Sequence, residues 1–497
     1  MLTGQRTRPA RLVVEPVELS APPGELVDRL AGLDDPAFLD SSARDGRYGR
    51  YSTLACSPLE VISLREGVLR DRSGAVLAAG SDEAIWAALG RAFAAVRAPG
   101  DPRAAYLPGW IGYVGYEVGR HVERLPGRAV RDTSLPDLRL AFYDALLLHD
   151  ALERRWSLVE LELEDPPPGA GAAGRTLREL AARAAAETPA PDPPPEAPRD
   201  ADIRSAEAGA RSNFSPADYR RAVRRCIDYI AAGDIFQVNL SQRFCVDDAP
   251  PPAAIYRALR GRNPAWYAGF LSFESGGRPC AVLSSSPELF LRVRGGHVVT
   301  RPIKGTRRRT GRGADDRAAR ADLLASPKDN AELAMIVDLL RNDLGRLCRF
   351  GSIRVTERRR LEAHPTVYHL VATVEGDVPA RVGPAELLRA TFPGGSITGA
   401  PKIRAMEIID ELEGVARGVY TGCLGIVCAD GTCEWNIAIR TIVYDAGRAL
   451  VQAGGGIVAD SDPAAEYQET LDKARAMLEA IAEARMRESV PHAGTST

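Results

Sequence analysis

Lysine is almost absent from this chain. Of its 64 basic residues 60 are arginines, and the four lysines are Lys304, Lys328, Lys402 and Lys473. Arginine supplies charge, but its pKa stays above about 12, so that a guanidinium does not lose its proton and attack as a neutral amine. A lysine in such a background, above all Lys304 in "RPIKGTRRR", is therefore a candidate for amine chemistry.

The chain also lacks a large net charge, a long apolar stretch and a C-x-x-C pair. The net charge is only −2, which argues against nucleic acid or an anionic membrane surface as the main partner. No stretch approaches the roughly 18 apolar residues of a membrane span, and no apolar signal region follows the N-terminus. The eight cysteines form no C-x-x-C pair, and their scatter is typical of reduced thiols. We therefore expect a cytoplasmic protein.

The chain divides by composition into four regions. Residues 1–165 alternate short strand-like runs with loops and predict a sheet-rich region. Residues 166–205 are so rich in proline and alanine that they predict a mobile linker without a core. Helical and strand-like patterns alternate over residues 206–488, and residues 489–497 are a polar tail. A length of 497 residues fits two or three domains or one large intertwined unit.

One predicted helix begins with two acids, in "SPKDNAELAMIVDLLRNDLGR" (residues 326–346). Asp329 and Glu332 lie three residues apart, so they share a face, and Glu332 stands at the edge of an apolar run. The ordinary alternative is that both acids only favour the positive end of the helix dipole.

A second predicted helix, residues 462–484, carries Glu466, Glu469 and Lys473 on one stripe. An exposed face with a Glu469–Lys473 pair is the ordinary alternative. If the two acidic helix starts converge, they form an oxygen-rich, open site of the kind that Mg²⁺ takes.

Two glycine-rich segments offer backbone N–H groups to an anion. In "QAGGGIV", which follows a strand-like run, Gly454, Gly455 and Gly456 let backbone N–H groups approach an anion closely, and a tight turn without a ligand is the ordinary alternative. "FPGGSITGAPKIRAMEII" predicts a loop that leads into a helix near Lys402. Neither segment matches a nucleotide-binding motif.

Two further residues could serve chemistry beside Lys304. Glu288 begins a predicted strand in "SSSPELFLRV", and His369 lies within the apolar run "PTVYHLVATV". A packed, hydrogen-bonded core histidine is the ordinary alternative for His369.

Taken together, the motifs resemble the chorismate-utilising enzymes: the large subunits of anthranilate synthase and aminodeoxychorismate synthase, and the isochorismate and salicylate synthases. The likeness covers residues 214–488, where "SPEL", "PIKGT", "AELAMIVDLLRNDLGR", "SITGAPKIRAMEIID", "RGVYTGCLGIV", "EWNIAIRT", "QAGGGIV" and "EYQETLDKA" occur in the family order. "FLDSS" and "NPAWYAGF" partly resemble the family's effector-site segments. The resemblance implies an α+β fold, in which antiparallel sheets form a sandwich-like core with helices packed outside.

The resemblance also implies a Mg²⁺ site. Its direct ligands would be Glu332 and Glu469, and Asp329 and Glu466 would reach the ion through water. Asp329 departs from the glutamate that the family often has at this place.

The resemblance implies a second set of residues, which would surround bound chorismate. At its ring carboxylate this set comprises Ser396, Gly454, Gly455, Gly456 and Lys473, and at the enolpyruvyl side chain it comprises Tyr420 and Arg440. His369 would lie beside the ring, and Glu288 would protonate the departing 4-hydroxyl group.

Two positions favour one member of the family. Isochorismate- and salicylate-forming members have a water-activating lysine where this chain has Gln237, and anthranilate synthases typically have alanine at the place of Lys304. The sequence therefore resembles the large subunit of aminodeoxychorismate synthase, in which Lys304 would form a covalent intermediate. Ammonia and a separate glutaminase subunit are the implied partners, because the resemblance leaves no segment for a glutamine-hydrolysing domain.

Two alternatives remain at this point. In the first, the chain is an anthranilate synthase large subunit and Lys304 is incidental. In the second, it is a catalytically silent homologue that serves as a regulatory or scaffolding partner of a glutaminase.

Overall fold

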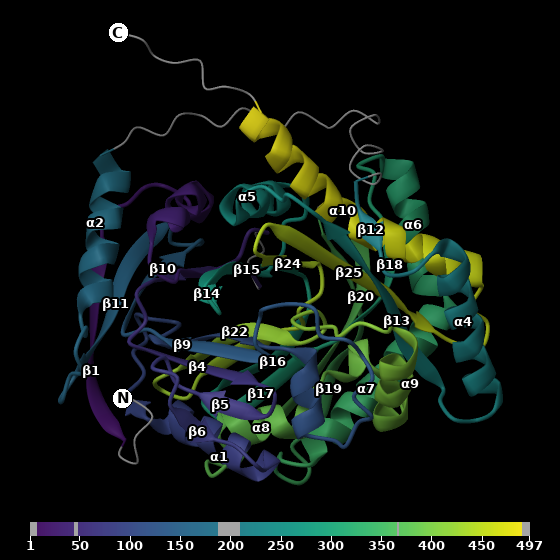
Figure 1. The fold of residues 1–497 in the computed structure, drawn as a ribbon, viewed down its shortest axis with the longest axis horizontal. Helices are drawn as coiled ribbons and strands as arrows, with labels where there is room; N and C mark the ends of the chain where they lie inside the picture. The colour runs from purple at the N-terminus through teal and green to yellow at the C-terminus, as the bar shows by residue number, and fades with distance from the viewer. Residues whose placement is uncertain (1–6, 44–47, 187–208, 365–366, 490–497) are drawn as a thin grey trace.

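The computed structural model describes residues 7–43, 48–186, 209–364 and 367–489, which form two large β-sheets packed face to face with helices outside them (Figure 1). Within these residues the strand pairing is antiparallel except between β1 and β7. The predicted sandwich of antiparallel sheets with outer helices is confirmed. No helix of the described part is long and apolar enough to cross a membrane.

The first sheet has thirteen strands. In spatial order they are β12 (Arg211–Ser212), β13 (Gln237–Val246), β25 (Arg448–Ile457), β24 (Thr441–Asp445), β15 (Arg278–Ser286), β14 (Tyr267–Ser275), β2 (Ala37–Asp40), β3 (Tyr51–Ala55), β10 (Ala145–Asp150), β11 (Arg155–Leu163), β1 (Arg8–Val17) and β7 (Val96–Arg97), with β21 (Gly399–Ala400) paired to β13.

The second sheet has twelve strands. Their order is β18 (Ile303–Arg308), β20 (Val367–Asp377), β17 (His297–Arg301), β16 (Leu289–Arg294), β23 (Cys433–Asn436), β22 (Cys423–Cys428), β8 (Gly109–Val114), β9 (Leu138–Phe142), β4 (Glu60–Arg65), β5 (Val68–Arg70) and β6 (Val76–Ala78), with β19 (Arg354–Ala363) paired to β20.

The helices lie around the sheets. Those described are η1 (Pro23–Gly32), α1 (Asp82–Ala94), η2 (Tyr116–His121), α2 (Ala172–Ala186), α4 (Pro216–Ala231), α5 (Pro252–Arg262), α6 (Gly313–Ala325), α7 (Pro327–Gly345), α8 (Pro384–Thr391), η3 (Gly395–Ile397), α9 (Lys402–Leu412) and α10 (Pro463–Ser489). Figure 1 shows α10 in yellow across the top of the molecule, α2 along one side, and α1 and α8 at the lower edge.

The first sheet is a middle layer, because successive side chains of its strands are buried on opposite faces. On β15, Val282 joins the apolar cluster that extends into the second sheet, whereas Leu283 joins the cluster that contains side chains of η1, α2, α5 and α10. Between the sheets, Phe273 stacks on Tyr113 with ring centroids 6.2 Å apart. This double burial explains the continuous apolar runs of the central strands.

The N-terminal region and the region after residue 206 share both sheets. In the first sheet β14 pairs with β2, and Phe270 lies opposite Phe38. In the second sheet β22 pairs with β8, and Gly425 lies opposite Gly112. The described residues therefore form one intertwined unit, and the boundary seen in the composition is no boundary between sheets.

The linker prediction for residues 166–205 is wrong in part. Residues 172–186 form α2, which packs on β10 and β11 and buries Leu177 and Leu180. Alanine and arginine favour a helix, and two leucines at this spacing are enough to attach it to the sheet. Residues 187–205 of the predicted linker and residues 490–497 of the predicted tail lie outside the described residues.

The helices that matter for the site begin at the residues that the sequence predicts. Ser326 Oγ accepts a hydrogen bond from the N–H of Asp329 and caps α7. Asp462 Oδ1 accepts from the N–H groups of Ala464 and Ala465 and caps α10. These caps fix where the acidic first turns lie.

A buried ion pair joins the elements behind the site. Arg417 and Glu413 lie 2.6 Å apart, and each side chain is only 1% exposed. Arg417 also donates hydrogen bonds to the carbonyl oxygens of Ile397 and Asn239 at 3.1 and 2.7 Å. Glu413 accepts one from the N–H of Ser241 at 2.8 Å. The pair thus connects the end of α9 with β13 and η3.

We expect the substitution Arg417→Met to lower the free energy of unfolding by about 3–5 kcal/mol, because it leaves the Glu413 carboxylate buried without its cation. Urea unfolding followed by tryptophan fluorescence measures the change. Arg341→Met is the control: it removes an exposed pair with Asp338, which is worth at most about 1 kcal/mol. Equal, small losses in both variants would contradict this account of the pair.

Candidate active site

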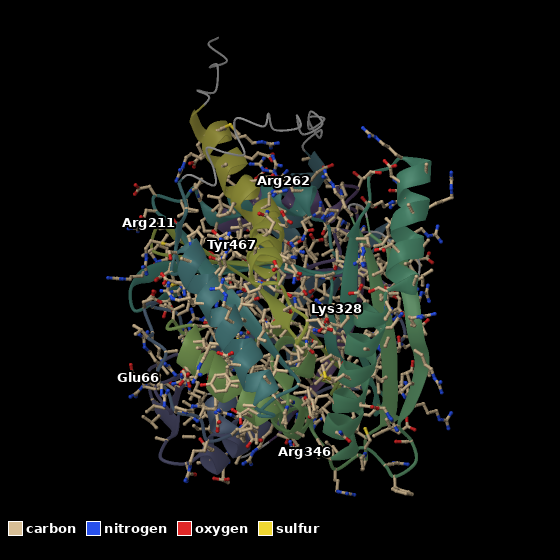
Figure 2. The ribbon with its side chains drawn as sticks, turned by 90° about the vertical axis from the view of Figure 1, so that its right-hand side faces the viewer. Glu66, Arg211, Arg262, Lys328, Arg346 and Tyr467 are labelled. Carbon is tan, nitrogen blue, oxygen red and sulfur yellow. The ribbon has the colours of Figure 1, made fainter. Side chains whose placement is uncertain are left out.

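The starts of α7 and α10 lie next to each other. Lys328, in the first turn of α7, lies 3.8 Å from the carboxylate of Glu466, in the first turn of α10. Figure 2 shows Lys328 between the yellow α10 and the green segments beside it. The carboxylates of Glu332 and Glu469 influence each other electrostatically. The structure thus brings together the two acidic helix starts that the sequence singles out.

Lys304 lies on β18 and points toward η3, where its Nζ donates a hydrogen bond to the carbonyl oxygen of Ser396 at 3.1 Å. Burial lowers the pKa of Lys304, against the opposing effect of the Glu332 and Glu288 carboxylates. A lowered pKa increases the fraction of neutral amine at neutral pH, and the neutral amine is the nucleophilic form.

Glu288 is buried beside this lysine, at the start of β16. Ser396 Oγ donates a hydrogen bond to Glu288 Oε1 at 2.6 Å. Burial raises the pKa of Glu288 to about 7, although the Ser396 hydrogen bond and the charge of Lys304 act in the other direction. A carboxyl group with this pKa gives and takes protons near neutral pH, as a general acid requires.

His369 lies on β20, buried, on the other side of Lys304. Its Nδ1 lies 3.0 Å from Thr306 Oγ1, and its ring packs edge-on against His364 with centroids 5.0 Å apart. Burial, together with the neighbouring His364 and Arg440, lowers the pKa of His369 to about 3. The imidazole is therefore neutral at physiological pH. It can accept or donate a hydrogen bond without adding charge.

The three glycines of "QAGGGIV" lie in a strand and not in a tight turn: Gly454, Gly455 and Gly456 belong to the last part of β25 and pair with β13. Glycine is needed at these positions because a side chain would collide with neighbouring atoms. A Cβ on Gly456 would lie 2.1 Å from Nε2 of Gln237, and one on Gly454 would lie 2.5 Å from the carbonyl oxygen of Leu240. The alternative of a tight turn is therefore excluded, because the pairing with β13 keeps this backbone extended.

Arg440 is placed to receive an anion. Its guanidinium donates a hydrogen bond to the carbonyl oxygen of Lys473 at 2.6 Å, and no carboxylate of the described residues forms an ion pair with it. Burial lowers the pKa of Arg440. Its φ of 51° is in the left-handed region, a strained conformation for a residue with a side chain. Tyr420 is buried nearby, and burial raises its pKa to about 12.

Lysine and arginine side chains lie among the four carboxylates of Asp329, Glu332, Glu466 and Glu469, which together form the acidic set. Lys473 Nζ lies 2.5 Å from Glu469 Oε1 and donates to the carbonyl oxygen of Gly454 at 2.8 Å. This contact with Lys473 lowers the pKa of Glu469. Asp329 receives a hydrogen bond from Arg307 at 3.1 Å, on the side that faces β18.

The acidic set suits an oxygen-preferring cation. A Cβ on Gly455 would lie 3.1 Å from Glu466 Oε2 and 3.3 Å from Glu469 Oε1, so that the glycine leaves space before both carboxylates. Burial raises the pKa of Glu332 and of Glu466, a cost that a bound cation offsets. Among the described residues no group of three or more Asp, Glu, His or Cys side chains is arranged to hold a metal alone. Mg²⁺ needs only one or two carboxylates beside waters and substrate oxygens.

Comparison with known proteins identifies the family. The family model described as chorismate binding enzyme matches residues 45–479. The chain belongs to the chorismate-binding enzyme family. It is 42% identical to the aminodeoxychorismate synthase component 1 of Klebsiella aerogenes, over 76% of this chain and 78% of that protein. It is 38% identical to the anthranilate synthase component 1 of Acetivibrio thermocellus, over 90% of both.

A solved structure supports the same family assignment. The crystal structure of anthranilate synthase component I from Streptococcus pneumoniae superposes with a TM-score of 0.71 at 31% identity, and covers 86% of this chain and 92% of that one. This chain is therefore a chorismate-utilising enzyme, as the resemblance of its motifs implies.

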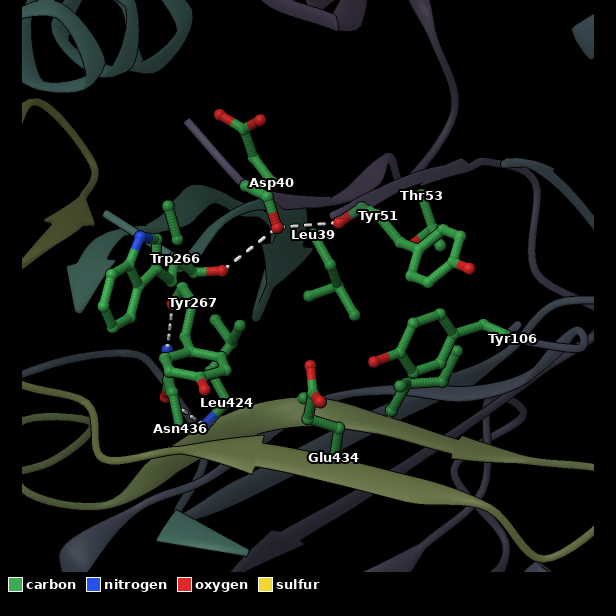
Figure 3. Close-up of a pocket in the computed structure, with 14 residues that line it drawn as sticks. Leu39, Asp40, Tyr51, Thr53, Tyr106, Trp266, Tyr267, Leu424, Glu434 and Asn436 are labelled. Atoms are coloured by element: carbon green, nitrogen blue, oxygen red, sulfur yellow. Dashed lines mark hydrogen bonds between the residues drawn. The ribbon is translucent and has the colours of Figure 1, made fainter. Parts of the chain in front are cut away.

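A separate cavity lies between the two sheets near the N-terminal strands (Figure 3). The segments "FLDSS" and "NPAWYAGF" both line it, through Leu39, Asp40 and Ser41 and through Trp266, Tyr267 and Ala268. Figure 3 shows the rings of Tyr51 and Tyr106 on one side of the cavity and Glu434 beneath it. The two segments that partly resemble effector-site segments thus meet at one place.

Three contributors to the site do not stand out from sequence reasoning. Lys328 appears among the four lysines, but nothing in the spacing pairs it with Glu466. Thr306 on β18 contacts His369 on β20, and His364, directly after the end of β19, packs on the same ring. The pairing of β18 and β19 with β20 brings them together. The rarity of lysine is the only signal that could find Lys328.

The raised pKa of Glu288 makes a prediction about stability. Because the folded protein holds this proton more tightly than the unfolded chain, this group's contribution is lost as the pH rises from the ordinary carboxyl value of 4.5 through about 7. Glu288→Gln cannot titrate, so its unfolding free energy relative to the parent should rise across this window by about 3 kcal/mol. Urea unfolding at several pH values measures it.

Glu274→Gln, at an exposed position of β14, serves as the control and should follow the parent at every pH. If Glu288→Gln also ran parallel to the parent between pH 4.5 and 7, Glu288 would not hold its proton in the folded state.

Proposed function

We propose that this enzyme is the large subunit of an aminodeoxychorismate synthase, which converts chorismate and ammonia to 4-amino-4-deoxychorismate. The observation that carries the proposal is the arrangement of Lys304, Glu288 and Ser396: a partly buried lysine with a lowered pKa beside a buried carboxyl group with a pKa of about 7. A nucleophilic amine next to a general acid is what a displacement at an allylic alcohol needs.

In the first step the neutral amine of Lys304 attacks ring C2. Both double bonds of the ring shift by one position, the C4–oxygen bond breaks, and Glu288 gives its proton so that the hydroxyl group leaves as water. Ammonia then attacks C4, both double bonds shift back, and the bond between C2 and Lys304 breaks, which releases the lysine as a neutral amine. The proton released by the new C4 nitrogen restores Glu288. One ammonia enters and one water leaves.

Substrate binding follows from the charges of the site. The guanidinium of Arg440 has no carboxylate partner among the described residues and suits the enolpyruvyl carboxylate, with Tyr420 beside it. The ring carboxylate would lie near Ser396, Lys473 and the open edge of β25 at Gly454–Gly456. His369 stays neutral beside the ring, so that it orients the substrate without repelling the cationic nitrogen.

Glu332 and Glu469 would bind Mg²⁺ directly, and Asp329 and Glu466 would do so through water. When bound, the ion supplies positive charge for the ring carboxylate. The space before Gly455 and the raised pKa values of Glu332 and Glu466 support this assignment.

Gln237 argues against activated water as the nucleophile. Its side chain is 2% exposed, its Nε2 lies against Gly456, and its amide does not accept a proton from water. A glutaminase subunit would supply the ammonia, which agrees with the name "component 1" of the relatives.

An anthranilate synthase large subunit is the second candidate. It is favoured by the relatives of that name, which match over 90% of this chain at 38% identity. In that reaction nitrogen adds at C2, and Lys304 would only line the site.

The decisive experiment incubates the purified chain with chorismate, ammonium and Mg²⁺ near pH 8.5, with and without aminodeoxychorismate lyase. We expect a 4-aminated product that the lyase converts to 4-aminobenzoate, and no product when a chelator replaces Mg²⁺. Fluorescent anthranilate in both tubes would instead assign the chain to the second candidate.

We expect Lys304→Ala and Lys304→Arg both to lower the rate of amination at C4 by at least 100-fold, because neither supplies a neutral amine. Lys304→Arg keeps the positive charge and thereby separates nucleophilic from electrostatic roles. Circular dichroism checks that both variants fold. An unchanged 4-aminated product and rate in Lys304→Arg would exclude the covalent step.

A further inference from the structure

Lys402 has no part in the proposed reaction, although it is one of only four lysines among 64 basic residues. It is the first residue of α9, where the positive end of the helix dipole disfavours a cation. Its side chain is only 14% exposed. A lysine is thus present at a position that neither burial nor the helix favours, and its partners must account for it.

The ammonium group of Lys402 joins three helices. Its Nζ lies 2.7 Å from Oδ2 of Asp343, near the end of α7. It also donates a hydrogen bond to the carbonyl oxygen of Thr391, the last residue of α8, at 3.2 Å. Burial raises the pKa of Asp343, and the charge of Lys402 acts against this effect. An ammonium group is compact and carries three donors, so that it reaches both acceptors from one point, whereas a guanidinium is a planar fork.

The contact with Thr391 closes the loop that carries Ser396. This Ser396 loop comprises residues 392–401, with Thr391 directly before it and Lys402 directly after it. The hydrogen bond between these two residues therefore ties the two ends of the loop together. Because Lys402 also pairs with Asp343, both ends are fixed to α7.

The middle of the Ser396 loop packs on the same helix. A Cβ on Gly395 would lie 2.5 Å from Cδ2 of Leu339 on α7, so the loop approaches the helix as closely as a glycine allows. Helix α7 also carries Glu332, about three turns before Asp343. One helix thus supports both the loop and a carboxylate of the acidic set.

Ser396 connects the loop with the two reacting side chains. Its carbonyl oxygen accepts a hydrogen bond from Lys304 at 3.1 Å, and its Oγ donates one to Glu288 at 2.6 Å. Burial raises the pKa of Glu288 to about 7. Three neighbours act against it: the hydroxyl group of Ser396, the charge of Lys304 and the backbone N–H group of Ile303. A displaced loop therefore changes the surroundings of both reacting groups at once.

We propose that Lys402 is a positioning residue, which holds the Ser396 loop on α7 in the place where Ser396 contacts the two reacting side chains. It acts through the loop and not on the substrate itself. The inference rests on the proposed function, because Lys304 and Glu288 serve as nucleophile and general acid in that reaction. It also explains why this position has a lysine in a chain that otherwise uses arginine.

The pH dependence of the reaction tests this role in the full chain. We measure kcat/KM for chorismate between about pH 5.5 and 9, at a fixed concentration of neutral ammonia, because kcat/KM reports the ionisation of the free enzyme. Without the hydrogen bond from Ser396 the pKa of Glu288 rises, so that the acid stays protonated to a higher pH.

In Lys402→Met we expect the alkaline limb of the profile to move up by about one pH unit. The maximal kcat/KM should fall about tenfold, because the reacting groups are displaced. Ser396→Ala should move the limb in the same direction. A variant that only loosens the fold would lower the rate equally at every pH and leave the limb in place.

Two further variants keep the test decisive. If Lys402→Met does not fold, the double variant Lys402→Met/Asp343→Asn decides alone, because it leaves no buried charge without a partner, and it should show the same shift. Arg404→Met is the control. It removes a cation from the same turn of α9, whose partners Asp234 and Glu407 are partly exposed, and it should keep the profile of the parent.

A folded Lys402→Met or double variant that keeps the alkaline limb of the parent would overturn the role of Lys402. So would an equal shift in Arg404→Met, since the effect would then not be specific to the loop. Failure of the proposed function is seen in the parent protein. A parent that forms no 4-aminated product refutes that function, whereas an active parent whose variants all keep its profile refutes only the positioning role.

Discussion

The buried Arg417–Glu413 pair is the interaction on which the site depends. Glu413 ends α9, and its carboxylate holds the backbone and the hydroxyl group of Ser241 on β13. Arg417 holds the carbonyl oxygen of Ile397, one residue after Ser396. Together they set the distance between β13, whose partner strand carries the glycines, and η3, whose Ser396 contacts both Lys304 and Glu288.

Lys304 and Glu288 have opposite ordinary charges, and burial drives both toward their neutral forms. Desolvation lowers the pKa of the amine and raises that of the acid. In water the same two groups would exchange a proton and form an ion pair, which is the wrong state for a nucleophile and a general acid. In the proposed reaction, the low-dielectric surrounding would therefore favour the neutral, nucleophilic amine and the protonated acid.

The sequence predicts which helices and which residues contribute to the site, but not how the fold brings these residues together. The capped starts of α7 and α10 follow from Ser326, Pro327, Asp462 and Pro463, because caps are local signals. The position of "GGG" within a strand depends on pairing with β13, more than 200 residues earlier in the chain, and no local pattern reports that. The prolines on both sides of α2 favour a mobile linker, and the composition does not reveal that Leu177 and Leu180 attach this helix to the sheet. The roles of Arg417 and Lys328 depend on contacts between distant elements, which spacing does not reveal.

Both sheets contain strands from the N-terminal and the C-terminal part of the chain. This arrangement affects how the protein folds during its synthesis on the ribosome. Strand β8, at residues 109–114, pairs with β9 on one side, but its other edge has no neighbour until β22, at residues 423–428, has been synthesised. Strand β2 likewise pairs with β3 and lacks its second neighbour until β14 has been synthesised. Until then the N-terminal half carries open, apolar strand edges of the kind that bind other chains. Pairings so distant in sequence also close slowly. We therefore expect the nascent chain to bind chaperones that cover strand edges. A chain truncated before residue 428 would be an aggregation-prone fragment and not a smaller enzyme.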